Sequence, residues 1–561
     1  MLYVCADGSI AHTGENLLSL IRGLSLNSEE PGPNSDNFVF FDILGLWFVA
    51  YRGFAVVFVH SAVCVCGLAM IYSLTKATAP QTKSALSFWL SLIKGEVYCV
   101  SMSVCTCAVV ALLAWLLCPM RFYDGGLLVA YVIYFPPAIT CAYFCRGIIA
   151  NHSHTTFDIR VLSSLLVWTP LLALCILCGV KSGFLCVIWV GGTICAYVAR
   201  HAASKWRVTK DEWVTVIGMY SYDLSLMLAV CIWWNVIHTV LLIVMPLLGR
   251  VGTAVPGDFV VGLIVAILLS LPCGVILADT NCQPPTATCV RRCVLAELCL
   301  LLVLAVTTSS YSSQHPKRLW MHHVHRDQIF EDGTTKVDHG ILVTAMDGRG
   351  MYPFLPSLTS GEVANVPTVM NENNRMVNYC NSWNGDCYFQ FPWLYPVADA
   401  MRDSFYIPTQ KPPDFPEKSK LFMAMSSTTT ADPLIRHIAI SLRGPPRMNL
   451  IVRDNASGQR IEGWDIDISR KMPDAHFVKP SPARPEGIHY IQVEFGLCLH
   501  DVCEGEIFLK VQGSASVQVA AYGYYMSLAD DATHSLLTAL PDWATGAEWS
   551  SCPSSFISKF I

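Results

Sequence analysis

Residues 258–278 read DFVVGLIVAILLSLPCGVILA, and no charged residue follows Asp258 in this run. A helix that crosses a bilayer needs about 20 mostly apolar residues, so the run predicts a transmembrane helix. Runs of similar character lie on both sides of it. The expected spans are 52–74, 97–118, 126–145, 161–179, 183–199, 224–248, 258–278 and 293–310.

Two further apolar segments do not fit a simple span. Phe38–Tyr51 carries Asp42 and many aromatic residues, so it is expected either to lie in the membrane interface or to lengthen the first helix. Trp213–Leu248 is too long for one span. It is interpreted as an interfacial turn of helix followed by a span, with two short spans as the alternative.

The composition agrees with a membrane protein. The mean hydropathy is +0.45, and 14% of the 561 residues are charged, against about 25% in an average soluble domain. The net charge of −5 gives no reason to expect binding to nucleic acid. The first 28 residues have neither the basic start followed by an apolar run nor the small-residue cleavage site of a signal peptide.

The short loops predict the orientation, because Lys and Arg accumulate on the cytoplasmic side. The loops after spans one, three, five and seven hold 11 positive residues, whereas those after spans two, four and six hold 3. The first set is Lys76, Lys83, Lys94, Arg146, Arg160, Arg200, Lys205, Arg207, Lys210, Arg291 and Arg292; the second is Arg121, Lys181 and Arg250. The N-terminal segment and everything after residue 310 are therefore expected on the non-cytoplasmic side.

Polar residues inside the spans are candidates for function, since they are costly there. Asp223, Asn235 and His238 lie around the sixth span, and Glu297 lies in the eighth. The alternative is that Asp223 and Glu297 sit near the interface, within reach of water or headgroups.

The composition and the pattern of the sequence change after Ser310. Short stretches rich in β-branched and aromatic residues alternate with turn-forming residues such as Gly444-Pro445-Pro446, which is typical of a β-sandwich. The expected strands are Arg436–Arg443, Asn449–Val452, Ile488–Phe495, Glu506–Val511 and Ser516–Tyr525. The predicted fold is thus a polytopic α-helical membrane domain of about eight spans at 38–309, followed by a mainly β, sandwich-like lumenal domain at 310–561.

Two features of the second half suit a compartment outside the cytosol. Asn455-Ala456-Ser457 is an acceptor for N-glycosylation at a predicted turn. Cys380 and Cys387 flank the turn pair Asn384-Gly385 and could close a small disulfide loop under oxidising conditions. Cys498 and Cys503 could do the same, although strand geometry could forbid it.

Several short segments resemble a known family in the right order along the chain. They are Ser9–Asn16 with Leu17-Leu18, Val39–Leu46, Leu248–Gly252, Tyr311–Ser313 with Pro316–Arg318, Phe391–Trp393 and Pro541–Trp543. The resemblance is to the endoplasmic reticulum metallopeptidases, also called the Felix-ina family, which are membrane-bound zinc exopeptidases. It implies an endoplasmic reticulum membrane protein in which residues 1–37 are the end of a peptidase domain.

The resemblance also implies where the zinc chemistry belongs. The family's two zinc ions are held by a His-x-Asp motif, a bridging Asp, a Glu-Glu pair, a further Asp and a final His, all expected before this chain's first family segment. His325-Arg326-Asp327, beside His322 and His323, matches His-x-Asp formally. However, the only Glu-Glu pair is Glu29-Glu30, far upstream, so this stretch is interpreted as an opening strand.

Two functional hypotheses follow. The first is the membrane and accessory part of a zinc exopeptidase-like protein, a fragment or alternative product that is inactive alone, with no catalytic or metal residue in this chain. The second is a catalytically inactive membrane scaffold whose lumenal domain binds a protein or glycan. A His-x-Asp and a Glu-Glu pair encoded in frame upstream of Met1 would favour the first. The lipid bilayer is an expected partner in both.

Overall fold

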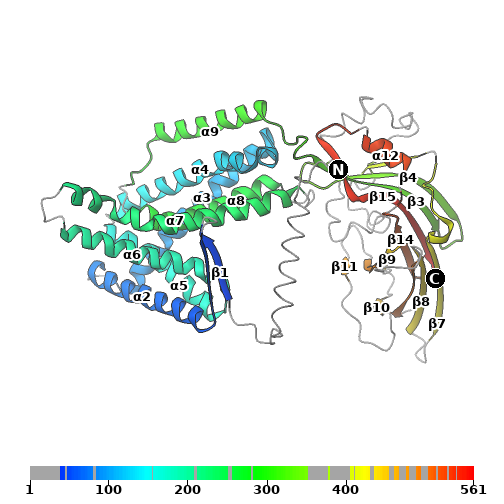
Figure 1. Cartoon of the computed structure of the whole chain (residues 1–561), viewed down its shortest axis with the longest axis horizontal. Coiled ribbons are helices and arrows are strands. Elements are labelled where there is room, and N and C mark those ends of the chain that lie inside the picture. Colours follow the sequence, from blue (N-terminus) through cyan, green and yellow to red (C-terminus); the bar gives the residue numbers. More distant parts are fainter. Residues whose placement is uncertain are drawn as a thin grey trace. The chain divides into compact units, whose positions relative to one another are not determined.

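The structure is a computed structural model, and its helices and strands are shown in Figure 1. It describes residues 38–43, 47–79, 84–153, 156–206, 212–249, 256–278, 282–350, 377–378, 405–409, 411–429, 435–453, 460–465, 476–478, 488–494, 503–512, 516–526, 528, 530–538 and 540–561. The chain divides into two compact units. The helical unit comprises Met1–Met245 and Gly257–Ser310, and the strand-rich unit comprises Pro246–Pro256 and Tyr311–Ile561.

The helical unit is built from eight long helices among the described residues. They are α2 (Phe54–Thr78), α3 (Ala85–Leu117), α4 (Arg121–Ser153), α5 (Phe157–Leu177), α6 (Phe184–Trp206), α7 (Glu212–Leu248), α8 (Gly257–Ile276) and α9 (Ala287–Thr307). The first seven contain stretches long and apolar enough to cross a membrane. The predicted multi-span helical domain is therefore confirmed.

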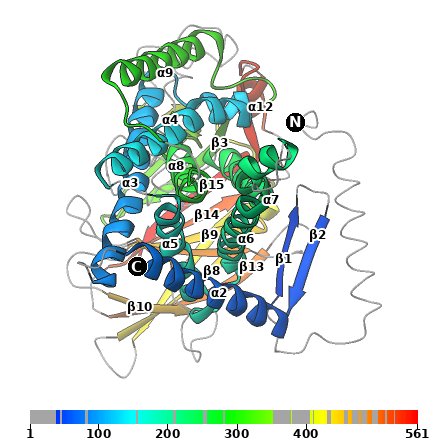
Figure 2. The same cartoon turned by 90° about the vertical axis from the view of Figure 1, so that its left-hand side faces the viewer.

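Helix α9 corresponds to the eighth expected span, but it begins six residues earlier than predicted. It consequently takes in Arg291 and Arg292 in addition to Glu297. It lies at the edge of the other helices (Figures 1 and 2), and Leu301 is its buried residue. At 21 residues it is long enough to cross a bilayer. However, because of its three charged residues it is not counted among the seven helices that are apolar enough to do so.

Two sequence-based alternatives are resolved here. Phe38–Tyr51 does not lengthen the first helix, because β1 (Phe38–Ile43) pairs with β2 (Trp47–Arg52) as an antiparallel hairpin. Its aromatic and β-branched residues favour the extended conformation. In contrast, Glu212–Leu248 forms one continuous helix of 37 residues, which excludes two short spans.

The strand-rich unit contains two sheets. One has the strand order β10-β13-β8-β7, and the other has the order β11-β12-β9-β14-β15-β3-β4-β6-β5. The strands are β3 (Lys317–Ile329), β4 (Thr335–Ala345), β5 (Val377–Asn378), β6 (Phe405–Pro408), β7 (Phe422–Thr429), β8 (Ile435–Gly444), β9 (Arg447–Arg453), β10 (Arg460–Asp465), β11 (His476–Val478), β12 (Ile488–Glu494), β13 (Cys503–Gln512), β14 (Gln518–Tyr524) and β15 (Ala544–Phe560).

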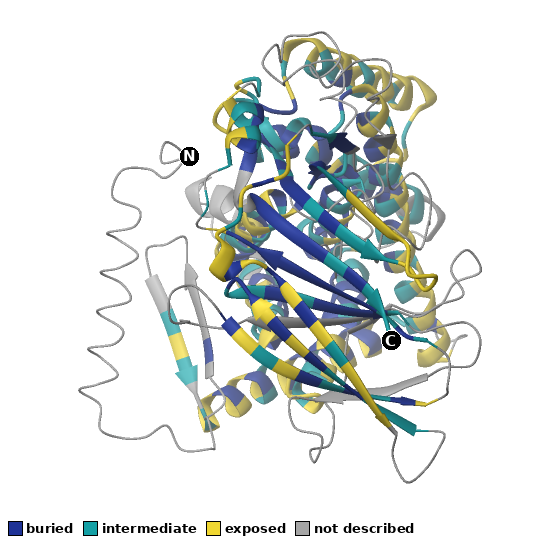
Figure 3. Ribbon diagram, turned by 90° about the vertical axis from the view of Figure 1, so that its right-hand side faces the viewer, coloured by how far each residue is buried: buried dark blue, intermediate teal, exposed yellow. Residues whose placement is uncertain are grey.

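The two sheets share one apolar core. Ile438, Ile440 and Leu442 alternate along β8 and are fully buried, and they join Leu450 of β9 and Leu509 of β13 in a single cluster. Burying each such side chain contributes about 1.5–3 kcal/mol. Figure 3 shows mostly buried residues along β3 and β14 of the larger sheet and mostly exposed residues along β7, at the edge of the smaller sheet. The expected β-rich, sandwich-like domain is confirmed.

The larger sheet also joins the beginning and end of the unit. Strand β15, at the C-terminus, pairs in parallel with β3, the first strand, and β3 pairs antiparallel with β4. The short helix α12 (Asp531–Thr538) covers a second apolar cluster that includes Leu319, Ile341 and Leu536. The pairing of β3 with β15 and β4 fixes the direction in which the side chains of His322, His323 and His325 point.

Candidate functional site

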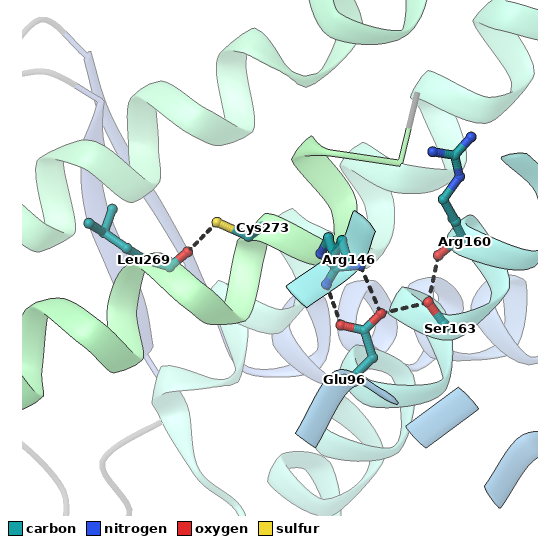
Figure 4. Close-up of polar contacts among 6 residues, drawn as sticks. All are labelled: Glu96, Arg146, Arg160, Ser163, Leu269 and Cys273. Carbon is teal, nitrogen blue, oxygen red and sulfur yellow. Dashed lines mark hydrogen bonds and ion pairs between the residues drawn. The ribbon is translucent and has the colours of Figure 1, made fainter. Parts of the chain in front are cut away.

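A buried ion pair joins two helices of the helical unit. Arg146 of α4 donates from Nη1 to Glu96 Oε1 of α3 at 3.2 Å and from Nη2 to Glu96 Oε2. The two side chains are only 9% and 10% exposed. A two-pronged arginine–carboxylate contact is among the stronger hydrogen-bonded arrangements in proteins. Figure 4 shows the guanidinium facing the carboxylate.

Helices α5 and α8 complete the surroundings of this pair. Ser163 Oγ of α5 lies 2.6 Å from Glu96 Oε1 and 2.8 Å from Arg160 O, so its single proton has two acceptors. On α8, a Cβ at Gly274 would lie 2.9 Å from Arg146 Nη2 and 3.1 Å from Glu96 Oε2. Only glycine therefore leaves room for the pair against the α8 backbone.

Beside the pair lies a cavity of about 150 Å³. Its polar lining comes from α3, α4 and α5: Ser91, Glu96, Arg146, Arg160 and Ser163. The Glu96 carboxylate is already bonded to Arg146 and Ser163, which suits it to hold helices and charge together. The arrangement fits recognition of an ionic group better than proton transfer to a substrate.

This site is not evident from the sequence. Glu96 falls one residue before the predicted span 97–118, and the charge pattern predicts a cytoplasmic loop for Arg146 and Arg160. Because α3 and α4 each extend to 33 residues, Glu96 and Arg146 lie within helices, and Arg160 lies within α5. The signal available in the sequence was a carboxylate beside the start of one predicted span and an arginine just after the end of another.

The polar span residues that were predicted do not come together. Asp223 is exposed, and His238 Nδ1 lies 2.9 Å from the hydroxyl of Tyr131. Glu297 Oε1 is buried and has no hydrogen-bond partner within the part of the chain that the structure describes. None of these three, nor Asn235, lines the cavity beside Glu96.

The histidines of β3 point in different directions. His322 is buried, with Nδ1 3.8 Å from Cys552 Sγ, whereas His323 contacts Asp530 Oδ1 and Thr409 Oγ1, each at 2.9 Å. His325 Nε2 lies 3.4 Å from Asp327 Oδ1. The interpretation of this stretch as an opening strand is confirmed. Among the described residues, no three His, Cys, Asp or Glu side chains are grouped so that they could hold a metal ion.

Burial of His322 predicts an acid-sensitive fold. Desolvation lowers the pKa of His322 to about 3, whereas an unfolded chain binds this proton near 6.5. The stability is therefore present above pH 6.5 and is lost as the pH falls towards 3. Between pH 7 and 5 the free energy of unfolding should drop by about 2 kcal/mol. Denaturant unfolding of the strand-rich unit at both pH values, within the full chain, measures this drop.

The control for this prediction is His322→Phe, which keeps a ring facing Tyr524 but cannot take up a proton. The variant should lose most of the pH dependence. An unchanged difference between pH 7 and pH 5 in the variant would assign the acid sensitivity to other groups.

Several predicted residues lie outside the described part of the chain. These are Asn455, Cys380, Cys387, Cys498 and the N-terminal segment 1–37. Cys503, at the start of β13, takes part in a disulfide, while Cys552 is a free, buried thiol. The Cys380–Cys387 disulfide and the Asn455 glycan therefore stay predictions.

Comparison with known proteins gives a consistent family. Residues 314–556 match the model of the endoplasmic reticulum metallopeptidase 1 C-terminal domain. The human endoplasmic reticulum metallopeptidase 1 is 24% identical over 583 residues, covering 96% of this chain and 58% of the human protein. The mouse protein is 23% identical, covering 98% and 60%. The chain thus spans less than two thirds of the length of these relatives.

A solved structure, the yeast delta-COP-I mu-homology domain, aligns with 44% of this chain and 95% of that one, at 9% identity and a TM-score of 0.19. So low a score carries no argument. The alignments to the human and mouse proteins, by contrast, extend over nearly the whole chain and include both the helices and the strand-rich unit. These similarities support membership of the endoplasmic reticulum metallopeptidase 1 family and a multi-span protein of the endoplasmic reticulum membrane.

Proposed function

We propose that this chain is the membrane anchor and accessory lumenal part of an endoplasmic reticulum zinc exopeptidase-like protein, and that it does not hydrolyse peptides by itself. The observation that carries the proposal is the order of its parts. Seven membrane-competent helices precede a strand-rich unit that matches the family's C-terminal domain. Neither unit brings His-x-Asp together with further zinc ligands in the described residues.

Two features support a lumenal strand-rich unit. Cys503 takes part in a disulfide, and disulfides persist in oxidising compartments such as the endoplasmic reticulum lumen. The loop charges also favour this orientation. Arg146 is left out of the count, because it pairs with Glu96 in the helical unit. Ten positive residues then remain on the proposed cytoplasmic side, against three on the other side.

Glycosylation tests the orientation directly. In the expressed full chain, Asn455 should carry a glycan, because a lumenal turn is accessible to the transferase. Glycosidase treatment should therefore increase gel mobility, and Asn455→Gln should abolish the shift. Asn151→Gln is the matched control, since its acceptor sequence lies at the end of α4, on the proposed cytoplasmic side, and should be unused. Protease digestion of the strand-rich unit in intact microsomes, without glycosylation, would refute the orientation.

Metal analysis tests the catalytic part of the proposal. Peptide hydrolysis at neutral pH needs an activated nucleophile, which a zinc-bound water supplies in this family. The purified chain should bind no stoichiometric zinc and should not cleave aminopeptidase substrates. About two zinc ions per chain with chelator-sensitive cleavage would overturn this, and loss of both in His325→Ala would assign the site to β3. Stable binding of a lumenal protein or glycan without zinc would instead favour the scaffold.

A further inference from the structure

Helices α3 and α4 meet along a row of small residues and lie side by side in Figures 1 and 2. On α3, four small residues recur at every fourth position and therefore share one face: Gly95, Cys99, Ser103 and Cys107. The last three are at most 1% exposed. Small residues at this spacing allow two helices in a membrane to approach each other closely, and Ser103 Oγ accordingly lies 3.5 Å from the backbone carbonyl of Ala138 on α4.

The same row brings two thiols from different helices into contact. A Cβ at Gly95 would lie 3.6 Å from Ile149 Cδ1 of α4. Cys99 follows Gly95 by one turn of α3, and Cys145 precedes Ile149 by one turn of α4. Because the two helices run in opposite directions, this register places Cys99 against Cys145, and their thiols interact. Both are free, buried cysteines.

The third thiol nearby, that of Cys141, is a poor partner for a disulfide. Its Sγ lies 3.9 Å from Cys145 Sγ, but both residues belong to α4 and are four positions apart. Cβ atoms at that spacing on a helix are about 5–6 Å apart, whereas a disulfide needs about 3.5–4.5 Å. Cys99 and Cys145 belong to different helices, so they are the pair that can be oxidised without distorting a helix.

Cys99 is also the member of the pair that a small molecule can reach. It lines the cavity of about 150 Å³ described above, whereas Cys145 does not. A cavity of this size holds molecules as small as water, and hydrogen peroxide is only slightly larger. The guanidinium of Arg146 lies near the Cys99 sulfur, and a neighbouring cation stabilises the thiolate, which is the reactive form of cysteine.

We propose that Cys99 and Cys145 are a thiol pair that a hydroperoxide oxidises to a disulfide, which links α3 covalently to α4. The Cys99 thiolate attacks one oxygen of hydrogen peroxide, the O–O bond breaks, and the departing hydroxide takes up the proton that Cys99 released. Cys99 is then a sulfenic acid. The Cys145 sulfur displaces its hydroxyl group, which leaves as water with the Cys145 proton. Two thiols and one hydrogen peroxide thus give one disulfide and two waters.

Peptide mapping of the full chain tests the proposal. The chain is purified in detergent under reducing conditions, freed of reductant and exposed to hydrogen peroxide. The remaining thiols are then blocked with N-ethylmaleimide, and the non-reduced peptides are identified by mass spectrometry. A peptide pair joined through Cys99 and Cys145 should appear and should vanish after treatment with dithiothreitol. In Cys145→Ala the linkage should be lost, and Cys99 should stop at the sulfenic acid, which dimedone labels.

The matched control is Cys105→Ala, which removes an exposed thiol from the same helix and should leave the yield of the linkage unchanged. Thermal unfolding of each variant shows that the helices remain folded. A link between Cys141 and Cys145 in place of the proposed one would overturn the proposal. So would peroxide that oxidises Cys105 while Cys99 and Cys145 are alkylated as fully as in the untreated chain.

Discussion

An Arg146→Met chain is expected to lose about 3–5 kcal/mol of stability in its helical unit. Methionine matches the arginine stem in length, but it leaves the Glu96 carboxylate without its cation in a site where the side chain is only 10% exposed. Ser163 alone cannot offset this buried charge. The expected result is a large fall in the thermal unfolding temperature of the detergent-solubilised chain, measured by fluorescence or size-exclusion chromatography after heating.

Two further variants separate the charge from the packing. Glu96→Gln combined with Arg146→Met removes both charges and should recover a large part of the loss, because replacing a buried pair by groups of similar volume is often close to neutral. Lys94→Met, on the same helix but exposed, should change the unfolding temperature little. A double variant as unstable as Arg146→Met would show that the packing of the arginine matters more than its charge.

The broad architecture was predictable because it depends on patterns that the sequence carries locally. Apolar runs of about 20 residues indicate the spans, and the strand β8 shows the period-two alternation of Ile438, Ile440 and Leu442 that a half-buried strand requires. The five strands expected between residues 436 and 525 all occur, as β8, β9, β12, β13 and β14. These features need no knowledge of a distant partner.

The candidate site was not predictable in the same way, because it depends on which helices meet. Glu96 and Arg146 are 50 residues apart, and each lies near the end of an apolar run, where charged residues are ordinary. Nothing local indicates that α3 and α4 extend beyond the bilayer core and bring the two together. The hairpin Phe38–Arg52 was missed for a different reason, since its apolar residues suit a strand and an interfacial helix equally well.

The parallel pairing of β15 with β3 is likewise a long-range feature. It brings Lys317 and Trp543 together, and the backbone N–H of Lys317 donates to the carbonyl of Trp543 at 2.8 Å. The same pairing places Cys552 beside His322. His322 thus lies on the opposite face of β3 from His323 and His325, because neighbouring side chains of a strand alternate between its faces.

An Asp347→Ala chain is expected to lose about 3–5 kcal/mol of stability in its strand-rich unit. Lys317 is fully buried at the start of β3, and its Nζ lies 2.8 Å from each carboxylate oxygen of Asp347. The ring of Tyr311 stands 4.9 Å from the same ammonium group, but a ring face cannot replace a carboxylate for a charge that is out of contact with water. Denaturant unfolding of the full chain, followed by tryptophan fluorescence and limited proteolysis of the strand-rich unit, measures the loss.

The matched control for this pair is Asp327→Ala, which removes the carboxylate that contacts His325. Its side chain is 37% exposed, and a partly solvated pair of this kind contributes at most about 1 kcal/mol. Asp347→Asn is the more discriminating variant. It keeps the shape and the acceptor for the Arg349 N–H, which lies 2.9 Å from Asp347 Oδ1, but it removes the charge. A loss close to that of Asp347→Ala shows that the charge on Asp347 stabilises the buried Lys317, whereas a loss as small as that of Asp327→Ala would mean that the pair is held mainly by shape and neutral hydrogen bonds.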